Sequence, residues 1–186
     1  MRLGPGPHLH GVTLMDGAVK GEEFDYFHDL IVNQQLVRAN ARGFQDGNLA
    51  GMTISLSVVL RYAKDEAWKK KIADECFSGR KKICLAATEA FAGPDVAGLR
   101  TTATKTDDGK HYIVNGSKKW ITNGMFCDYL VTAVKTEKGL SVLLIERSEG
   151  VETKLIKTSY SSTAGTAFVL ALFDAMQIPI PRRAFL

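Results

Sequence analysis

The chain has 186 residues, of which 45% are hydrophobic and 24% are charged, and its formal net charge is +4. This composition is typical of a globular protein and excludes a largely disordered or membrane-embedded one, and the length suits one domain or two small ones. The basic residues occur in short scattered runs such as Lys69-Lys70-Lys71 and Lys118-Lys119. A nucleic-acid surface would interleave basic residues with stacking aromatics, so we expect a solvated face and no nucleic-acid partner.

Three helices are predicted in the first 80 residues, after a lead of about 20 residues rich in Gly and Pro. The first begins near Phe24, after acidic residues, and closes at Gly43. The second covers residues 49–63 and is apolar nearly all round, so we expect it to be buried. The third has Asp65 as its N-cap and stops at Ser78-Gly79; its apolar stripe consists of Trp68, Ile72 and Cys76.

After Lys82 the hydrophobic period changes to two, and turn signals recur every eight to twelve residues. Helices followed by strands indicate an α+β protein, with a helical domain at residues 1–82 and a β domain at 83–186. The spacing of the turn signals predicts an antiparallel meander that closes into a barrel or sandwich. The candidate strands are residues 83–88, 99–106, 111–122, 129–135, 140–147, 151–158 and 167–173.

Cysteines and histidines indicate no metal site. Cys76, Cys84 and Cys127 are odd in number and have no paired spacing, and the four histidines include no pair one helical turn apart with a Glu. The N-terminus has no apolar core of signal-peptide length, and the longest apolar stretch, residues 49–60, is too short to span a bilayer. We therefore expect a soluble intracellular protein, located in the cytoplasm, mitochondrial matrix or peroxisome.

Residues 114–124 place an aromatic side chain and a hydroxyl close together. Asn115-Gly116 is a two-residue signal for a tight hairpin turn. Thr122 follows Trp120 by two residues, which points both side chains to one strand face. Upstream, residues 83–98 are predicted to form a buried strand that breaks into a loop of small residues, where the backbone could approach a ligand closely.

Together, these two segments resemble the middle domain of the acyl-CoA dehydrogenase family, flavoproteins that oxidise acyl-CoA thioesters to enoyl-CoA. The likeness extends from about Gly17 to Pro179, and residues 173–179 resemble the family's last barrel strand. It implies a partial N-terminal helical domain and a whole middle domain, without the family's C-terminal helical domain. It also implies FAD as cofactor, acyl-CoA as substrate, a flavoprotein or oxygen as electron acceptor, and a homo-oligomeric family.

The resemblance further implies which residues contact the flavin. Trp120 and Ile121 would lie beside the ring, and Thr122 would hydrogen-bond N5, the atom that receives the hydride. Pro94 would also lie near the substrate, but the family usually has Ser there, and proline lacks both the hydroxyl and the N–H. Each lost bond should weaken FAD binding by roughly 1.5 to 3 kcal/mol. The remaining contacts implied are Leu85, Ala87 and Thr88 along the ring edge, and Gly93 and Pro94 at the pyrophosphate.

The family's catalytic base is a Glu on the C-terminal helical domain, so the resemblance implies no catalytic residue in this chain. Glu89 is interpreted as a buried or turn-pairing carboxylate. Alternatives are a non-catalytic assembly module of the same fold, a flavin oxidase relative such as an acyl-CoA oxidase or nitroalkane oxidase, and a basic β-barrel that binds single-stranded nucleic acid. For the last of these, Tyr112 and Tyr129 are the candidate stacking residues.

Overall fold

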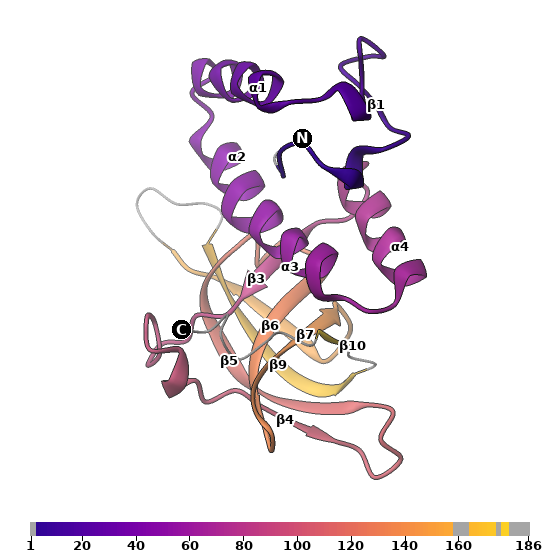
Figure 1. The fold of residues 1–186 in the computed structure, drawn as a ribbon. Helices are drawn as coiled ribbons and strands as arrows, with labels where there is room; N and C mark the ends of the chain where they lie inside the picture. Colours follow the sequence, from indigo (N-terminus) through magenta and orange to yellow (C-terminus); the bar gives the residue numbers. More distant parts are fainter. Residues whose placement is uncertain (1–2, 158–163, 174–175, 179–186) are drawn as a thin grey trace.

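The computed structural model describes residues 3–157, 164–173 and 176–178. Helices lie on one side of a curled sheet that forms a half-barrel (Figure 1). The α-helices precede all strands of the large sheet in the chain, so the α+β class predicted from the change of hydrophobic period is confirmed. The first strand of the large sheet starts at Ile83, where the period was predicted to change.

The N-terminal lead contains short ordered elements rather than a featureless loop. Thr13–Leu14 (β1) and Val19–Lys20 (β2) pair as a small antiparallel ribbon. A 3₁₀ turn on either side of this ribbon, at Pro7–Leu9 (η1) and Gly21–Glu23 (η2), connects it to the neighbouring chain. Leu9 is buried, and the neighbouring His8 ring stacks on Phe77, which places this lead against the helix that ends at Phe77.

The first predicted helix is shorter in the structure. It runs over Tyr26–Arg38 (α1), and the Asp25 side chain caps it by accepting hydrogen bonds from the amides of Phe27 and His28. It ends before Asn40, which adopts a left-handed conformation with φ of 49°, one that asparagine tolerates better than most residues. None of the α1 residues is buried.

A second, continuous helix follows from Arg42 to Tyr62. It consists of Arg42–Asp46 (α2), a π-helical stretch at Gly47–Thr53 (η3) and Ile54–Tyr62 (α3), with helical dihedrals at both junctions. The prediction that it is buried all round is wrong: Leu56 and Val59 are buried, whereas Leu49 and Ile54 are about half exposed. The sheet lies on one side of the helix, so only the face that carries Leu56 and Val59 packs against it.

The third helix, Glu66–Phe77 (α4), agrees with its prediction. The Asp65 side chain accepts a hydrogen bond of 2.9 Å from the Trp68 amide, as an N-cap does. Gly79 closes the helix with φ of 72°, a conformation that glycine adopts without strain.

Eight strands form the large sheet among the described residues, in the order β10-β7-β6-β4-β5-β9-β8 with β3 paired to β6. Most pairs are antiparallel, as predicted, but β3 and β4 both run parallel to β6, so the sheet is mixed. A parallel pair needs a long crossover connection, which the chain provides before β6 in both cases. The strands are Ile83–Ala86 (β3), Thr102–Lys105 (β4), Tyr112–Thr122 (β5), Tyr129–Thr136 (β6), Gly139–Glu146 (β7), Val151–Leu155 (β8), Ala164–Phe173 (β9) and Met176–Ile178 (β10).

The predicted hairpin turn at Asn115-Gly116 is wrong. Both residues lie inside β5 and pair with β4 or β9 on either side. Gly116 is required for a different reason: a Cβ there would collide with the Thr101 hydroxyl and lie 2.7 Å from Thr101 Cα. The glycine allows β5 and the entry to β4 to approach closely.

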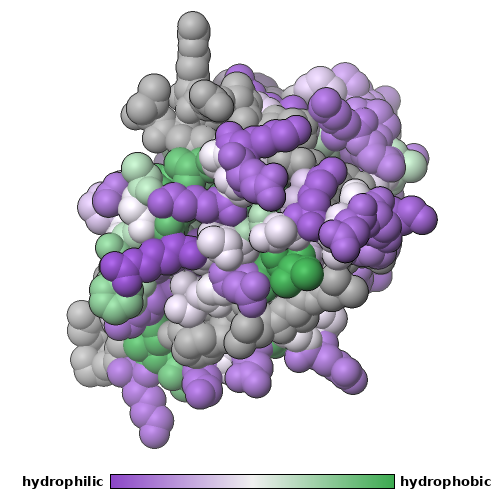
Figure 2. All heavy atoms as spheres, turned by 90° about the horizontal axis from the view of Figure 1, so that it is seen from below, coloured by the Kyte–Doolittle hydropathy of each residue, from purple (hydrophilic) through white to green (hydrophobic). Residues whose placement is uncertain are grey.

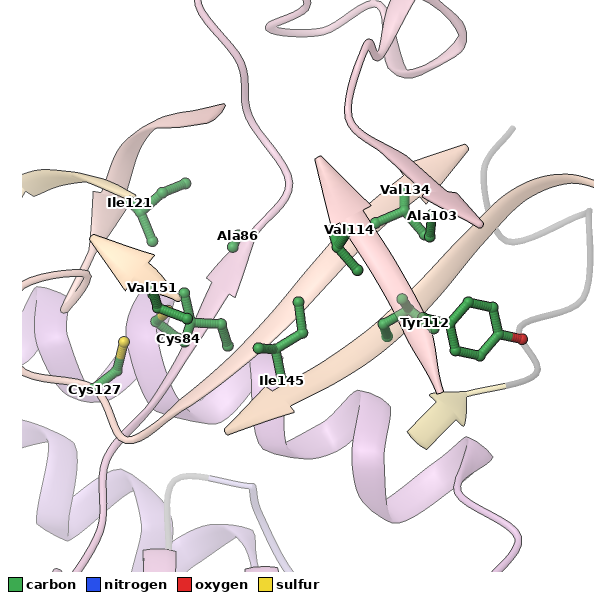
Figure 3. Close-up of a cluster of buried hydrophobic side chains, with 12 residues drawn as sticks. Cys84, Ala86, Ala103, Tyr112, Val114, Ile121, Cys127, Val134, Ile145 and Val151 are labelled. Carbon is green, nitrogen blue, oxygen red and sulfur yellow. The ribbon is translucent and has the colours of Figure 1, made fainter. Parts of the chain in front are cut away.

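Two hydrophobic clusters cover the two faces of the central strands. One lies inside the curl of the sheet and includes Cys84, Val114 and Ile145 (Figure 3). The other lies between the sheet and the helices α3 and α4, where Val59 and Ile72 meet Val131. Because both faces of β6 are covered, this strand is a nearly continuous apolar run instead of an alternating one. The end of the β domain away from the helices is mostly hydrophilic, with small separate apolar areas (Figure 2).

Candidate functional site

The structure brings the two segments that resemble the family's flavin site, residues 83–98 and 114–124, into direct contact. The backbone N–H of Lys119 donates to the Thr88 carbonyl at 2.9 Å. The Lys118 ammonium donates to the Ala87 carbonyl at 3.1 Å and to Glu89 Oε1 at 2.7 Å. The loop that leaves β3 is therefore attached to β5 directly before Trp120.

Glu89 is the centre of a buried polar network. Its Oε1 accepts from the Thr101 amide at 3.0 Å and the Thr101 hydroxyl at 2.5 Å, and its Oε2 accepts from the Arg100 amide at 2.7 Å. Burial alone would raise the pKa of this carboxyl. The hydrogen bonds from Lys118, Thr101 and the Arg100 amide outweigh it and bring the pKa down to about 2. Glu89 is thus an ionised carboxylate with four recorded donors, and it is buried, as one of the two sequence interpretations had it.

The pKa of Lys118 is also lowered, but for an ammonium a lower pKa disfavours the charged form. Lys118 is fully buried, and burial lowers the pKa of its ammonium, which the bond to Glu89 offsets only in part. The difference follows from the number of partners, because the carboxylate receives four donors whereas the ammonium has two recorded acceptors. The pair as a whole is charge-neutral and excluded from water.

Trp120 lies on a β-bulge. Lys118 pairs with Ala167 and Ile121 with Gly165, so two residues of β5 stand opposite one residue of β9. Trp120 is one of these two and has φ of 62°, an unusual conformation for a bulky side chain. Its ring is half exposed, and the Lys119 ammonium lies 5.0 Å from the ring centroid.

The neighbours of Trp120 differ in burial. Ile121 is 1% exposed and belongs to the cluster inside the curl of the sheet, whereas Thr122 is partly buried. The bulge interrupts the simple alternation that the sequence pattern assumed between residues 118 and 121. In the sequence, the Trp120 ring and the Thr122 hydroxyl remain separated by one core residue, Ile121.

The remaining predicted contacts lie along β3 and its loop. Leu85 is partly buried against the cluster under the helices, and Ala87 is partly buried against Ala92 and Leu99. Gly93 and Pro94 are exposed at the tip of the loop, and a Cβ at Gly93 would meet nothing within 4 Å. The loop thus has a fixed base and an open tip.

Two features of this region went unpredicted. The ion pair of Lys118 with Glu89 has a sequence signal, because Lys118 falls on the same phase of β5 as the buried residues Tyr112 and Val114. The bulge at Trp120 has no such sequence signal, since nothing in the local sequence marks the insertion.

Among the described residues, no helix is long and apolar enough to cross a membrane.

A curled sheet with helices on one side places the chain among α+β proteins that contain a β half-barrel domain. Residues 84–170 match the family model of the acyl-CoA dehydrogenase middle domain. The chain belongs to the acyl-CoA dehydrogenase family.

Two fungal relatives are similar over most of this chain. Acyl-CoA dehydrogenase apdG of Emericella nidulans is 39% identical over 168 residues, which is 87% of this chain and 38% of the relative. Acyl-CoA dehydrogenase AFT10-1 of Alternaria alternata is 36% identical over 93% of this chain and 40% of its own length. The chain therefore spans about two fifths of the length of these curated relatives.

Solved structures support the same family. An acyl-CoA dehydrogenase from Bacillus anthracis, complexed with FAD, superposes with a TM-score of 0.63 at 30% identity, covering 70% of this chain and 23% of that chain. A glutaryl-coenzyme A dehydrogenase in complex with glutaryl-CoA superposes with a TM-score of 0.57 at 32% identity, covering 67% of this chain and 32% of that chain.

Proposed function

We propose that this chain provides the flavin-binding part of an FAD-dependent oxidoreductase that removes hydrogen from the α and β carbons of an acyl-CoA thioester. The observation that carries the proposal is the junction of the two segments: the loop after β3 and the strand with Trp120 are joined by Lys118 and Lys119. The FAD complex of the similar Bacillus anthracis enzyme supports the choice of cofactor.

The residues at this junction suit a flavin. The half-exposed Trp120 ring offers a flat surface for the isoalloxazine, and the Thr122 hydroxyl is a donor and acceptor for N5. The open tip at Gly93 leaves room for a pyrophosphate, although Pro94 offers no N–H to it. FAD supplies the hydride-accepting chemistry when bound, and these side chains bind and orient it.

The domains follow from the same proposal. We propose residues 83–186 as the flavin-binding β domain and residues 1–82 as a helical part, of which α3 and α4 cover the outer face of β6 and β7. Leu85, Ala87 and Thr88 would border the ring edge, with Ile121 holding the Trp120 strand in the core. An acyl-CoA substrate, an electron acceptor and self-association belong to the proposal by family membership.

Glu89 is unsuited to remove the substrate α-proton. The Glu89 carboxylate accepts four recorded hydrogen bonds, and its pKa near 2 makes it a weak base. We therefore propose that the base comes from outside the described residues. The FAD-loaded chain mixed anaerobically with acyl-CoAs of several lengths should not bleach the flavin band rapidly; rapid bleaching would make a local carboxylate the base.

Cofactor binding is tested by titrating FAD and following the quenching of its fluorescence. Trp120→Ala should abolish or strongly weaken binding because the stacking surface is lost, and Thr122→Val should weaken it by one hydrogen bond. Trp68→Phe, in α4 and outside the proposed site, is the matched aromatic control and should bind like the wild type. Equal affinity in the wild type, Trp120→Ala and Thr122→Val would contradict the proposal.

A further inference from the structure

We propose that Lys118 and Glu89 are a positioning pair, which fixes the spacing between the loop after β3 and the strand that presents Trp120, and that FAD affinity depends on this spacing. The inference rests on the flavin role proposed above. Neither side chain is placed in contact with the flavin. Their effect would pass through the backbone segments that they join.

The bonds of the pair connect three separate stretches of chain. Lys118 is on β5, two residues before Trp120. Its ammonium reaches the carbonyl of Ala87 at the start of the loop and the carboxylate of Glu89 two residues later. Glu89 in turn receives the amides of residues 100 and 101, where the loop ends and β4 approaches. The loop is thus held at both of its ends and against β5.

Net stability is a weak explanation for burying such a pair. Lys118 is 0% exposed and Glu89 is 6% exposed, so both charges lose nearly all their hydration. The desolvation cost of a buried ion pair generally cancels much of its attraction, and apolar replacements often leave stability unchanged. What an apolar pair could not supply is the directional set of bonds to the loop backbone. The geometry therefore points to positioning as the role of this pair.

The close packing around the network supports the same role. Thr101 donates both its amide and its hydroxyl to Glu89, and it faces Gly116, where even a methyl group would collide with it. The network therefore has no room to shift along β5. Loss of the Lys118 ammonium should loosen the loop, because its two bonds join Ala87 and Glu89 to β5.

The test compares Lys118→Met, Glu89→Gln and the double variant with a matched control. Lys81→Met removes the ion pair of Lys81 with Glu146, which is 2.6 Å long and lies at the junction of β3 with β6 and β7. FAD affinity is measured by fluorescence quenching, stability by urea unfolding, and loop order by hydrogen exchange at the amides of Arg100 and Thr101. Glu89→Gln keeps the size of the side chain, and the double variant avoids an unpaired buried charge if Lys118→Met folds poorly.

The expected result is a specific loss. Lys118→Met should weaken FAD binding by about tenfold to hundredfold, because FAD would then have to order the loop at a cost comparable to one lost hydrogen bond to a charged group. The amides of Arg100 and Thr101 should exchange faster while those of β6 and β7 stay protected. Lys81→Met should lose stability without a comparable loss of affinity.

Two results would overturn the inference. One is unchanged exchange at Arg100 and Thr101 in Lys118→Met and Glu89→Gln. The other is an affinity loss no larger than that of Lys81→Met at equal stability. A wild-type chain that binds no FAD would instead refute the flavin role, and the exchange measurement would still decide whether the pair holds the loop.

Discussion

The side-chain amide of Asn123 donates a hydrogen bond of 2.8 Å to the backbone carbonyl of Gly47, which lies 76 residues earlier in the chain. Asn123 follows the strand that carries Trp120, and Gly47 begins the π-helical stretch of the long helix. The Asn123 side chain is 7% exposed and fits against Gly47 and Gly51. The helical part is therefore anchored directly to the end of β5.

This contact predicts a severe effect of a methyl group at Gly51. A Cβ there would collide with the Asn123 amide nitrogen and lie 2.6 Å from its Cγ, so Gly51→Ala should lower the free energy of unfolding by about 1 to 3 kcal/mol. Asn123→Gly removes the collision and tolerates the φ of 65° at that position. The double variant should be more stable than the sum of the single effects predicts. Additive losses in urea unfolding would contradict the contact.

Gly116→Ala should also destabilise the protein, because its Cβ would collide with Thr101 inside the sheet. We expect a loss of about 1 to 3 kcal/mol, typical of overpacking in a close contact. Gly93→Ala is the control, since a Cβ there meets nothing. If Gly116 were instead a surface turn residue, the two substitutions would have similarly small effects in urea unfolding.

Glu89 should make stability depend on pH in the acid range. Its pKa is lowered from 4.5 to about 2 in the folded chain, so its contribution is complete above pH 4.5 and is lost as the pH falls through 2. A shift of this size corresponds to about 3 kcal/mol. The difference in unfolding free energy between wild type and Glu89→Gln should therefore shrink between pH 5 and pH 2, the range of the shift. A difference that is constant with pH would show that Glu89 has an ordinary pKa.

Tyr129→Phe should weaken the junction of α4 with the sheet. The buried Tyr129 hydroxyl donates to Glu75 at 2.5 Å and accepts from Lys81 at 2.9 Å. Burial and the Glu75 carboxylate together raise the pKa of this tyrosine to about 12. Removing the hydroxyl should cost about 1 to 3 kcal/mol, since Glu75 and Lys81 each lose a bond at a partly buried position. Tyr26→Phe, at a side chain that is 75% exposed, should leave thermal unfolding unchanged.

The exposed apolar side of α1 predicts self-association. Phe27, Leu30 and Val37 are each at least half exposed, and apolar surface of this kind favours association. Sedimentation velocity should show a concentration-dependent increase in mass for the wild type, reduced in Phe27→Glu/Leu30→Glu. A wild-type monomer over the whole micromolar range would contradict the prediction.

Much of the fold followed from local patterns in the sequence. The cap at Asp65 and the strands from Ile83 onwards were predictable because capping and alternation depend on neighbouring residues. The role of Gly116 was not, since its partner Thr101 is distant in sequence and the residue type fits a turn equally well. The junction at Lys118 combines both cases: its buried phase is local, but its acceptors are 29 and 31 residues away.

The bulge at Trp120 has a consequence for how this part of the molecule can change. Because Trp120 is one of two residues opposite a single residue of β9, it lies outside the regular ladder, which resumes at Ile121. Lys118 and Ile121, which are paired with β9 and buried, lie on either side of this bulge. The residue proposed to face the flavin and the residues that hold the strand are therefore different ones, so we expect the first to be replaceable by side chains that tolerate its φ of 62° without disturbing the second.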